Sequence, residues 1–221
     1  MNNIIIYFLI SFVFSSYKII IPMDSYQTNH LKAYGVSFSS LKKNIKVDWL
    51  LNYRGGSFLV DFSNRIEREC MLKNVYFEKI SIEEISIIYS IIEENNMEIV
   101  TLDKAPKIAV YSPPNQQPWD DAVTLALTYA DIKYDVIFDD EIMNNKLYDY
   151  DWLHLHHEDF TGQYGKFYKY RNKDWYLDME SKFNLTATKY GFKSVHALKK
   201  TIALKIKNYI NDGGFLFAMC S

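Results

Sequence analysis

The last fourteen residues, 208–221, constrain the fold most strongly. Apolar residues at helical spacing lead into this stretch and continue to its third residue, with Ile202, Ile206 and Ile210 marking one face of a helix. Gly213 and Gly214 follow, and glycine lets the backbone turn sharply at the end of a helix. The apolar run 215–220 then has the length and composition of a short buried strand. A helix that turns directly into a buried strand predicts an α/β sheet.

The rest of the chain alternates between strand and helix patterns. In the first half, residues 18–22 and 47–53 are predicted strands on either side of a helix at 30–43. This order predicts a βαβ unit, in which the two strands are parallel and joined by a right-handed crossover. Further predicted elements are a strand at 75–80, a helix at 83–94, a strand at 97–101 and a linker at 103–106.

The second half is more regular than the first. Predicted strands lie at 107–111, 134–138, 150–157 and 215–220, with a helix at about 120–130. The sequence therefore predicts an α/β protein with a flavodoxin-like, doubly wound parallel sheet. We expect two lobes, 17–105 and 106–221, and expect the second to stop after its last predicted strand.

Composition excludes several classes of protein. The chain is 48% hydrophobic, which is typical of a core-forming protein and excludes a disordered one. The formal net charge is −2, and acidic and basic residues are well mixed. We therefore expect no nucleic acid partner. No sequence pattern here predicts an oligomeric state.

The N-terminus carries a separate signal. Residues 4–14 form an apolar run that is too short to span a bilayer but long enough for the core of a signal peptide. We interpret residues 1–16 as an export signal, so that the mature protein would have no stable membrane span. The alternatives are a hydrophobic first strand or an uncleaved anchor, and a leader that does not function would leave the protein in the cytoplasm.

Ligands of open α/β sheets bind beyond the carboxyl ends of the strands. In the second half these positions hold Asn115, the run 154–159 (His-Leu-His-His-Glu-Asp) and Cys220. In the first half they include Arg54, which could hold a carboxylate or phosphate or could form a surface ion pair. We therefore expect a small-molecule ligand, with Arg54, Asn115, His154, His157 and Asp159 as candidate binding residues.

Cys220 is the candidate nucleophile. It ends the last predicted strand, where the N-terminal amides of a succeeding helix would favour a thiolate. His156 and Glu158 are the nearest candidates for general acid or base. The alternative for Cys220 is an inert cysteine in a buried strand.

The histidine run offers a second chemistry. Side chains alternate along a strand, so His154 and His156 should share one face, and such a pair can bind Zn²⁺. A divalent transition metal is the only cofactor that we can suggest from the sequence. The alternative is a set of histidines that are hydrogen-bonded at a strand end beside a solvated acidic loop.

The pattern of helix, Gly-Gly, apolar strand and Ala-Met-Cys-Ser at 218–221 resembles the nucleophile elbow of class I glutamine amidotransferases and their ThuA-like relatives. The resemblance implies that Cys220 attacks a glutamine side-chain amide. Two positions depart from that pattern. Ala218 stands where the family usually has glycine, and residues 156–158 replace a glycine pair of the oxyanion hole.

Four segments also resemble an exported family from Bacteroidota whose members are commonly named asparagine synthetase B. These are residues 21–24 (IPMD), 49–56 (WLLNYRGG), 107–114 (KIAVYSPP) and 151–160 (DWLHLHHEDF). Members continue past the elbow, so the resemblance implies that a helix following Cys220 is missing from these 221 residues. We therefore expect apolar sheet surface to be open around Phe215, Phe217 and Met219, and the Cys220 pKa to lie near the free-thiol value of roughly 8.5.

Overall fold

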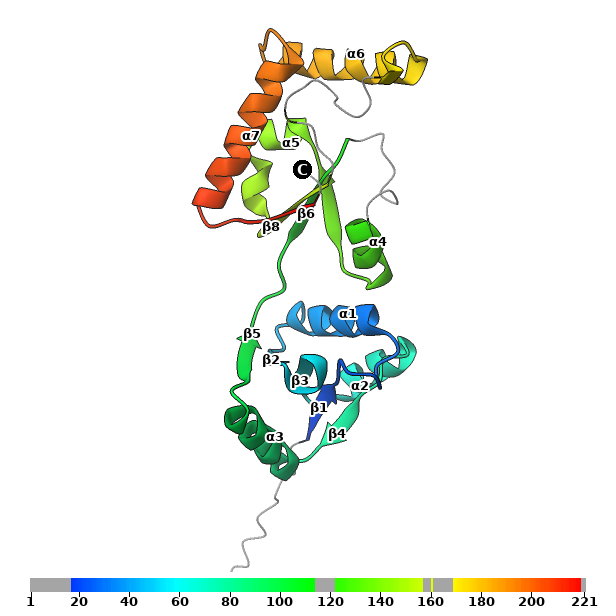
Figure 1. The fold of residues 1–221 in the computed structure, drawn as a ribbon, viewed down its shortest axis with the longest axis vertical. Helices are drawn as coiled ribbons and strands as arrows, with labels where there is room; N and C mark the ends of the chain where they lie inside the picture. Colours follow the sequence, from blue (N-terminus) through cyan, green and yellow to red (C-terminus); the bar gives the residue numbers. More distant parts are fainter. Residues whose placement is uncertain (1–16, 114–121, 157–159, 161–168, 220–221) are drawn as a thin grey trace, which may run out of the picture. The chain divides into compact units, whose positions relative to one another are not determined.

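The computed structural model describes residues 17–113, 122–156, 160 and 169–219 (Figure 1). The chain divides into two compact units, residues 1–105 and 106–221. Each unit is described by itself below, as unit 1 and unit 2.

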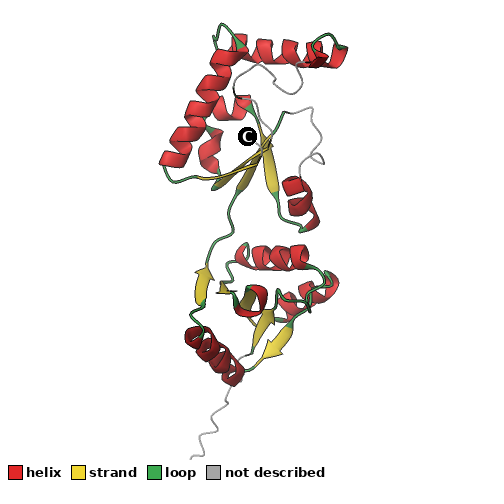
Figure 2. Ribbon diagram, in the orientation of Figure 1, coloured by secondary structure: helices red, strands yellow, loops and turns green. Residues whose placement is uncertain are grey.

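Unit 1 contains a five-stranded sheet in the order β4-β1-β3-β2-β5. Every pair of neighbouring strands in it is antiparallel. Three α-helices accompany the strands (Figure 2). In chain order the elements are β1 (Lys18–Ile21), α1 (His30–Leu41), β2 (Val47–Leu51), η1 (Tyr53–Gly55), β3 (Ser57–Asp61), α2 (Asn64–Leu72), β4 (Glu78–Ile80), α3 (Ile82–Glu94) and β5 (Glu98–Leu102).

Helices cover both faces of the unit 1 sheet because its central strands are apolar on both sides. In β1, Ile19 and Ile21 pack with buried residues of α1 and α2, whereas Ile20 packs on the other face with α3. Serines begin two of these helices. The Ser63 side chain caps α2, and Ser81 forms a reciprocal capping box with Glu84 at the start of α3.

The predicted βαβ unit of the first half is wrong. Strands β1 and β2 are not neighbours, because β3 lies between them and pairs antiparallel with both. The prediction failed because β3 and the helix after it were not recognised. Gly55 and Gly56 end the loop after β2 with φ of +81° and +91°, so the chain reverses there into an adjacent strand.

Unit 2 contains a four-stranded parallel sheet in the order β7-β6-β8-β9. This confirms the expected α/β class and parallel pairing for the second half. The elements are β6 (Ile108–Tyr111), α4 (Ala122–Tyr129), β7 (Tyr134–Ile137), α5 (Asp139–Met143), η3 (Lys146–Asp149), β8 (Trp152–His156), α6 (Asp174–Lys189), α7 (Val195–Asn211) and β9 (Phe215–Met219).

The main core of unit 2 lies between the sheet and α5, α6 and α7. Alternate residues of the strands, such as Ala109, Tyr111, Leu153 and Leu155, point into this core. Figure 1 shows α4 on the other side of the sheet from α5 and α7. Helix α7 begins at a Ser194 cap and places a stripe of apolar residues on the core: Val195, Leu198, Ile202, Ile206 and Tyr209.

The turn between α7 and β9 follows the prediction from its two glycines. Gly213 adopts φ of +100°, and the Gly214 amide donates to the Tyr209 carbonyl at 2.9 Å. A Cβ on Gly214 would overlap the Tyr209 ring, so the glycine also permits close packing. The expected open surface on β9 is confirmed for Phe215 and Phe217, which are 73% and 46% exposed.

The described helices include no segment that is long and apolar enough to cross a membrane. The predicted export signal, residues 1–16, lies outside the described residues.

Candidate functional site

The carboxyl ends of β6, β8 and β9 meet at one edge of the unit 2 sheet. Tyr111 of β6 is level with Leu155 of β8, and Leu155 is level with Ala218 of β9. All three strands are parallel, so they end at the same edge of the sheet, and each is followed in the chain by a separate segment. These are the segments that carry Asn115, the run 157–159 and Cys220.

The register brings two candidate residues close in the backbone. His156 is the register partner of Met219, and Cys220 follows Met219 directly in the chain. The register therefore relates the two candidates only through Met219 and the backbone of His156. Asn115, His157, Glu158, Asp159 and Cys220 lie outside the described residues, as does the side chain of His156.

His154 is fully buried between two strands. Its Nδ1 lies 3.2 Å from the Phe217 carbonyl oxygen, and its ring stacks on the Phe217 ring at 5.7 Å between centroids. A carbonyl oxygen can only accept, so Nδ1 carries the proton in this hydrogen bond. This contact joins β8 to β9. It agrees with the alternative prediction that the histidine is hydrogen-bonded within the protein.

No group of three or more histidine, cysteine, aspartate or glutamate side chains suited to a metal ion occurs among the residues that the structure describes. The metal prediction for His154 and His156 therefore depends on residues beyond those described. Nδ1 of His154 donates to the Phe217 carbonyl oxygen, so this nitrogen cannot also bind a metal ion in the geometry seen here.

Arg54 lies in unit 1 and makes an internal network. Its side chain donates to Asp24 at 2.7 Å and to Glu78 at 2.9 Å, and it lies 5.8 Å from the Tyr26 ring centroid. Burial alone would lower the Arg54 pKa, but hydrogen bonds to the two carboxylates raise it. Burial alone would raise the Asp24 pKa, but the hydrogen bond from Arg54, the Tyr26 amide and the Arg54 charge lower it by more. The Asp24 pKa therefore lies below its usual value.

This network serves the fold. Arg54 has φ of +46°, and its carbonyl accepts a hydrogen bond from the Met23 amide at 3.0 Å. Its guanidinium therefore closes the loop after β2 onto the loop after β1. Of the two roles expected for Arg54, the structure shows the ion pair. Both of its carboxylate partners, Asp24 and Glu78, belong to unit 1.

A buried polar network lies close to the carboxyl ends of β6 and β7. The Tyr111 hydroxyl donates to Asp139 Oδ1. Lys199 Nζ lies 2.9 Å from the Tyr111 hydroxyl oxygen and 3.0 Å from each Asp139 carboxylate oxygen. All three residues are at most 3% exposed.

Aromatic rings complete the surroundings of Lys199. Its ammonium nitrogen lies 4.2 Å from the Phe138 ring centroid and 5.1 Å from that of Phe183. Rings stabilise a cation at this range, and the carboxylate supplies the opposite charge. The sequence prediction missed this network. Its signal was a lysine on the apolar stripe of a helix, beside Leu198 and Ile202, where a solvated lysine is unusual.

Comparisons of the chain with protein-family models, with curated proteins and with solved structures gave no match. The function is therefore argued from the geometry described above.

Proposed function

We propose that unit 2 is a class I amidotransferase-like domain in which Cys220 attacks a carboxamide. The observation that carries the proposal is the register of β8 and β9, which places His156 beside the residue that precedes Cys220. A nucleophile beside a general base is the arrangement that covalent catalysis requires. The strand order gives further support, because β7-β6-β8-β9 matches the first four strands of the flavodoxin-like order.

In the proposed reaction the Cys220 thiolate bonds to the amide carbon and the carbon–nitrogen bond breaks. His156 or Glu158 would deliver a proton to the departing nitrogen, so that ammonia leaves and a thioester remains. Water or another acceptor then cleaves the thioester and regenerates the thiol. A side-chain amide such as that of glutamine is the substrate class that the elbow-like sequence favours.

The same proposal places the protein in the exported family named asparagine synthetase B, with two lobes and with residues 1–16 removed as a leader. Export to the periplasm or cell envelope follows from that assignment.

Affinity labelling tests the proposal. The protein is incubated at pH 9 with a chloroketone analogue of glutamine, and labelled peptides are identified by mass spectrometry. We expect labelling of Cys220 that saturates with reagent concentration and slows in the presence of glutamine, since a binding step precedes alkylation. Cys70 is an internal control, because burial raises the pKa of its thiol to about 12 and leaves it protonated at pH 9.

A matched reagent without the carboxamide-like group separates recognition from simple thiol reactivity. The proposal fails if both reagents label Cys220 at the same unsaturable rate, or if glutamine gives no protection.

The second candidate is a non-catalytic module that binds a small ligand. It is favoured by a hollow beside the ends of β6 and β7, described in the next section. Ligand binding that persists in a Cys220→Ser variant, without any labelling that saturates at Cys220, would favour this candidate.

A further inference from the structure

A hollow of about 460 Å³ opens between the end of β7, α5 and α6. This volume lies in the range of small-molecule binding sites. Three parts of unit 2 contribute to its wall: the residue after β6, the segment 136–141 and the inner edge of α6. The lining residues on which the inference depends are Ser112, Phe138, Glu141, Met179, Phe183 and Thr186.

One part of the wall is apolar. The Phe138 and Phe183 rings lie 5.7 Å apart between centroids and are tilted by 36°. Met179 lies one helical turn before Phe183 on α6. An aromatic or aliphatic body of ligand size can bury its surface against such a wall, as most small-molecule sites require.

The charges of the wall are almost all compensated within unit 2. Asp139 is paired with Lys199, and Asp140 accepts hydrogen bonds from Lys189 and Tyr190 at 2.7 Å each. Lys182 is paired with Asp178 on its own helix at 2.6 Å. These pairs leave the lining with one carboxylate to account for.

Glu141 is that carboxylate. Its Oε2 accepts the Phe138 amide at 3.0 Å, which fixes the side chain at the start of α5. No lysine or arginine lies within ion-pair distance of it among the residues covered by the structure. A partly exposed carboxylate beside an aromatic wall matches a ligand with one positive charge and an apolar body.

We propose that this hollow binds a small amphipathic ammonium compound, with the ammonium on Glu141 and the apolar body against Phe138 and Phe183. The site lies at the β7 edge of the sheet, whereas β9, the strand that precedes Cys220 in the chain, lies at the opposite edge, beyond β6 and β8. The inference is therefore independent of the thiol chemistry proposed above.

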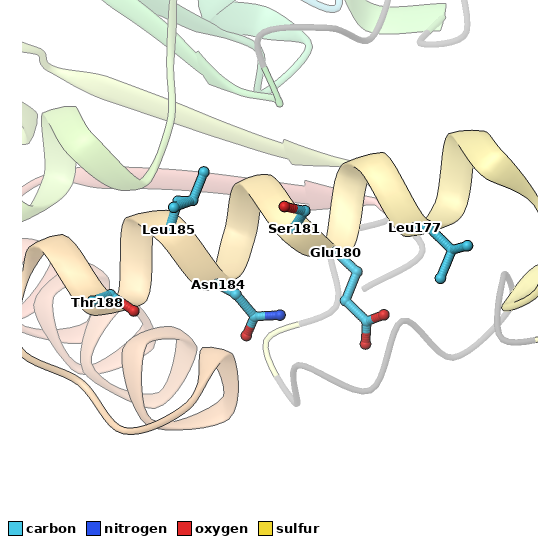
Figure 3. Close-up of a pocket in the computed structure, with 6 residues that line it drawn as sticks. All are labelled: Leu177, Glu180, Ser181, Asn184, Leu185 and Thr188. Atoms are coloured by element: carbon cyan, nitrogen blue, oxygen red, sulfur yellow. The ribbon is translucent and has the colours of Figure 1, made fainter.

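A second hollow provides the contrast. It has a volume of about 390 Å³, and its described lining comes from α6 alone: Leu177, Glu180, Ser181, Asn184, Leu185 and Thr188 (Figure 3). These side chains lie along one face of the helix and do not converge from several elements. That face supplies control positions for the test.

The binding test uses three probes of similar shape: phenethylamine, which is cationic at pH 7, the neutral 2-phenylethanol and the anionic 3-phenylpropionate. Dissociation constants are measured by NMR titration of the 221-residue protein. We expect phenethylamine to bind at least about tenfold more tightly than 2-phenylethanol, and 3-phenylpropionate to bind most weakly. The same titrations on Cys220→Ser protein should give the same constants.

Glu141→Gln tests the charge. Glutamine keeps an oxygen that can accept the Phe138 amide, so the cap is retained while the charge is removed. We expect phenethylamine binding to fall about tenfold and 2-phenylethanol binding to stay unchanged, which also shows that the pocket remains folded. Glu180→Gln, on the outer hollow of α6, should change neither constant.

Thr186→Phe tests the location by filling the hollow from its rim, with Thr188→Phe as the matched control on the same helix. We expect only Thr186→Phe to abolish binding of both probes. The inference is overturned if no probe binds, if the neutral probe binds as tightly as the cation, or if Glu141→Gln leaves phenethylamine binding unchanged.

Discussion

Removing the positive charge of Lys199 should severely destabilise unit 2. In the Lys199→Met variant, a methionine fills the space against Phe138 and Phe183, but Asp139 loses its cation while it stays completely buried. Breaking a buried ion pair by removing one partner costs about 3–5 kcal/mol, because a charge is left without compensation. We expect a loss of this size in the free energy of unfolding.

A second substitution should restore most of the loss. In the Lys199→Met/Asp139→Asn variant no charge is buried, and the asparagine side-chain oxygen can still accept from the Tyr111 hydroxyl. Replacing both members of a buried pair is often close to neutral. The double variant should therefore be more stable than Lys199→Met by at least about 2 kcal/mol.

The assay is urea unfolding followed by amide hydrogen exchange in peptides from residues 169–219, so that unit 2 is measured separately from unit 1. Lys200→Met is the matched control. Lys200 is exposed, and its substitution should stay within about 0.5 kcal/mol of the parent. A loss below about 1 kcal/mol for Lys199→Met, or a double variant no more stable than the single one, would refute the account of this network.

Three further predictions concern other parts of the chain. Cys70 is buried and its pKa is raised to about 12, so folding favours the neutral thiol. The free energy of unfolding of unit 1 should therefore fall as pH rises from about 9 towards 12. In a Cys70→Ala variant, the fall from the value at pH 7 should be smaller. Calorimetry with Zn²⁺ should show weak binding of one ion per chain that His156→Ala reduces, and binding no stronger than that of a His154→Ala/His156→Ala protein would exclude the metal prediction. N-terminal sequencing of protein from its native host should begin near Ser16 or Tyr17, whereas an intact Met1 in a cytosolic fraction would contradict export.

The sequence was most informative about the strands of unit 2 and the turn into β9. The strands of unit 2 are short apolar runs bounded by turn residues, and their positions were predicted to within two residues. Gly213 and Gly214 marked the turn into β9 correctly, since one requires a positive φ and the other admits the Tyr209 ring. These are local requirements, which a single sequence can express.

Strand pairing in unit 1 depends on residues that are distant in the sequence, so short patterns did not predict it. The antiparallel order depends on β3, whose five residues follow a glycine pair and resembled part of a loop. Helix α2 buries only Ile66 and Cys70, so its apolar period was too weak to stand out. Without those two elements, strand, helix and strand at 18–53 suggested a parallel crossover.

The candidate site was only partly predictable for a different reason. Position at strand ends predicted that the run 154–159 and Cys220 would lie at one edge of the sheet. The β8–β9 register pairs His156 of that run with Met219, the residue before Cys220 in the chain. The Tyr111–Asp139–Lys199 network joins residues 28 to 88 positions apart in the chain. Such contacts depend on how helices pack over the sheet, which no short pattern encodes.

The most direct test of the proposed chemistry is to look for the covalent intermediate. The protein is incubated with glutamine at pH 9, where a thiol with a pKa near roughly 8.5 is mostly thiolate, and is then quenched in acid and digested. We predict a glutamyl thioester on the peptide that contains Cys220, sensitive to hydroxylamine, with ammonia released in at least equal amount and with neither product in a Cys220→Ser protein. An unmodified Cys220 peptide, or ammonia release that persists in Cys220→Ser, would contradict the assignment of Cys220 as the nucleophile.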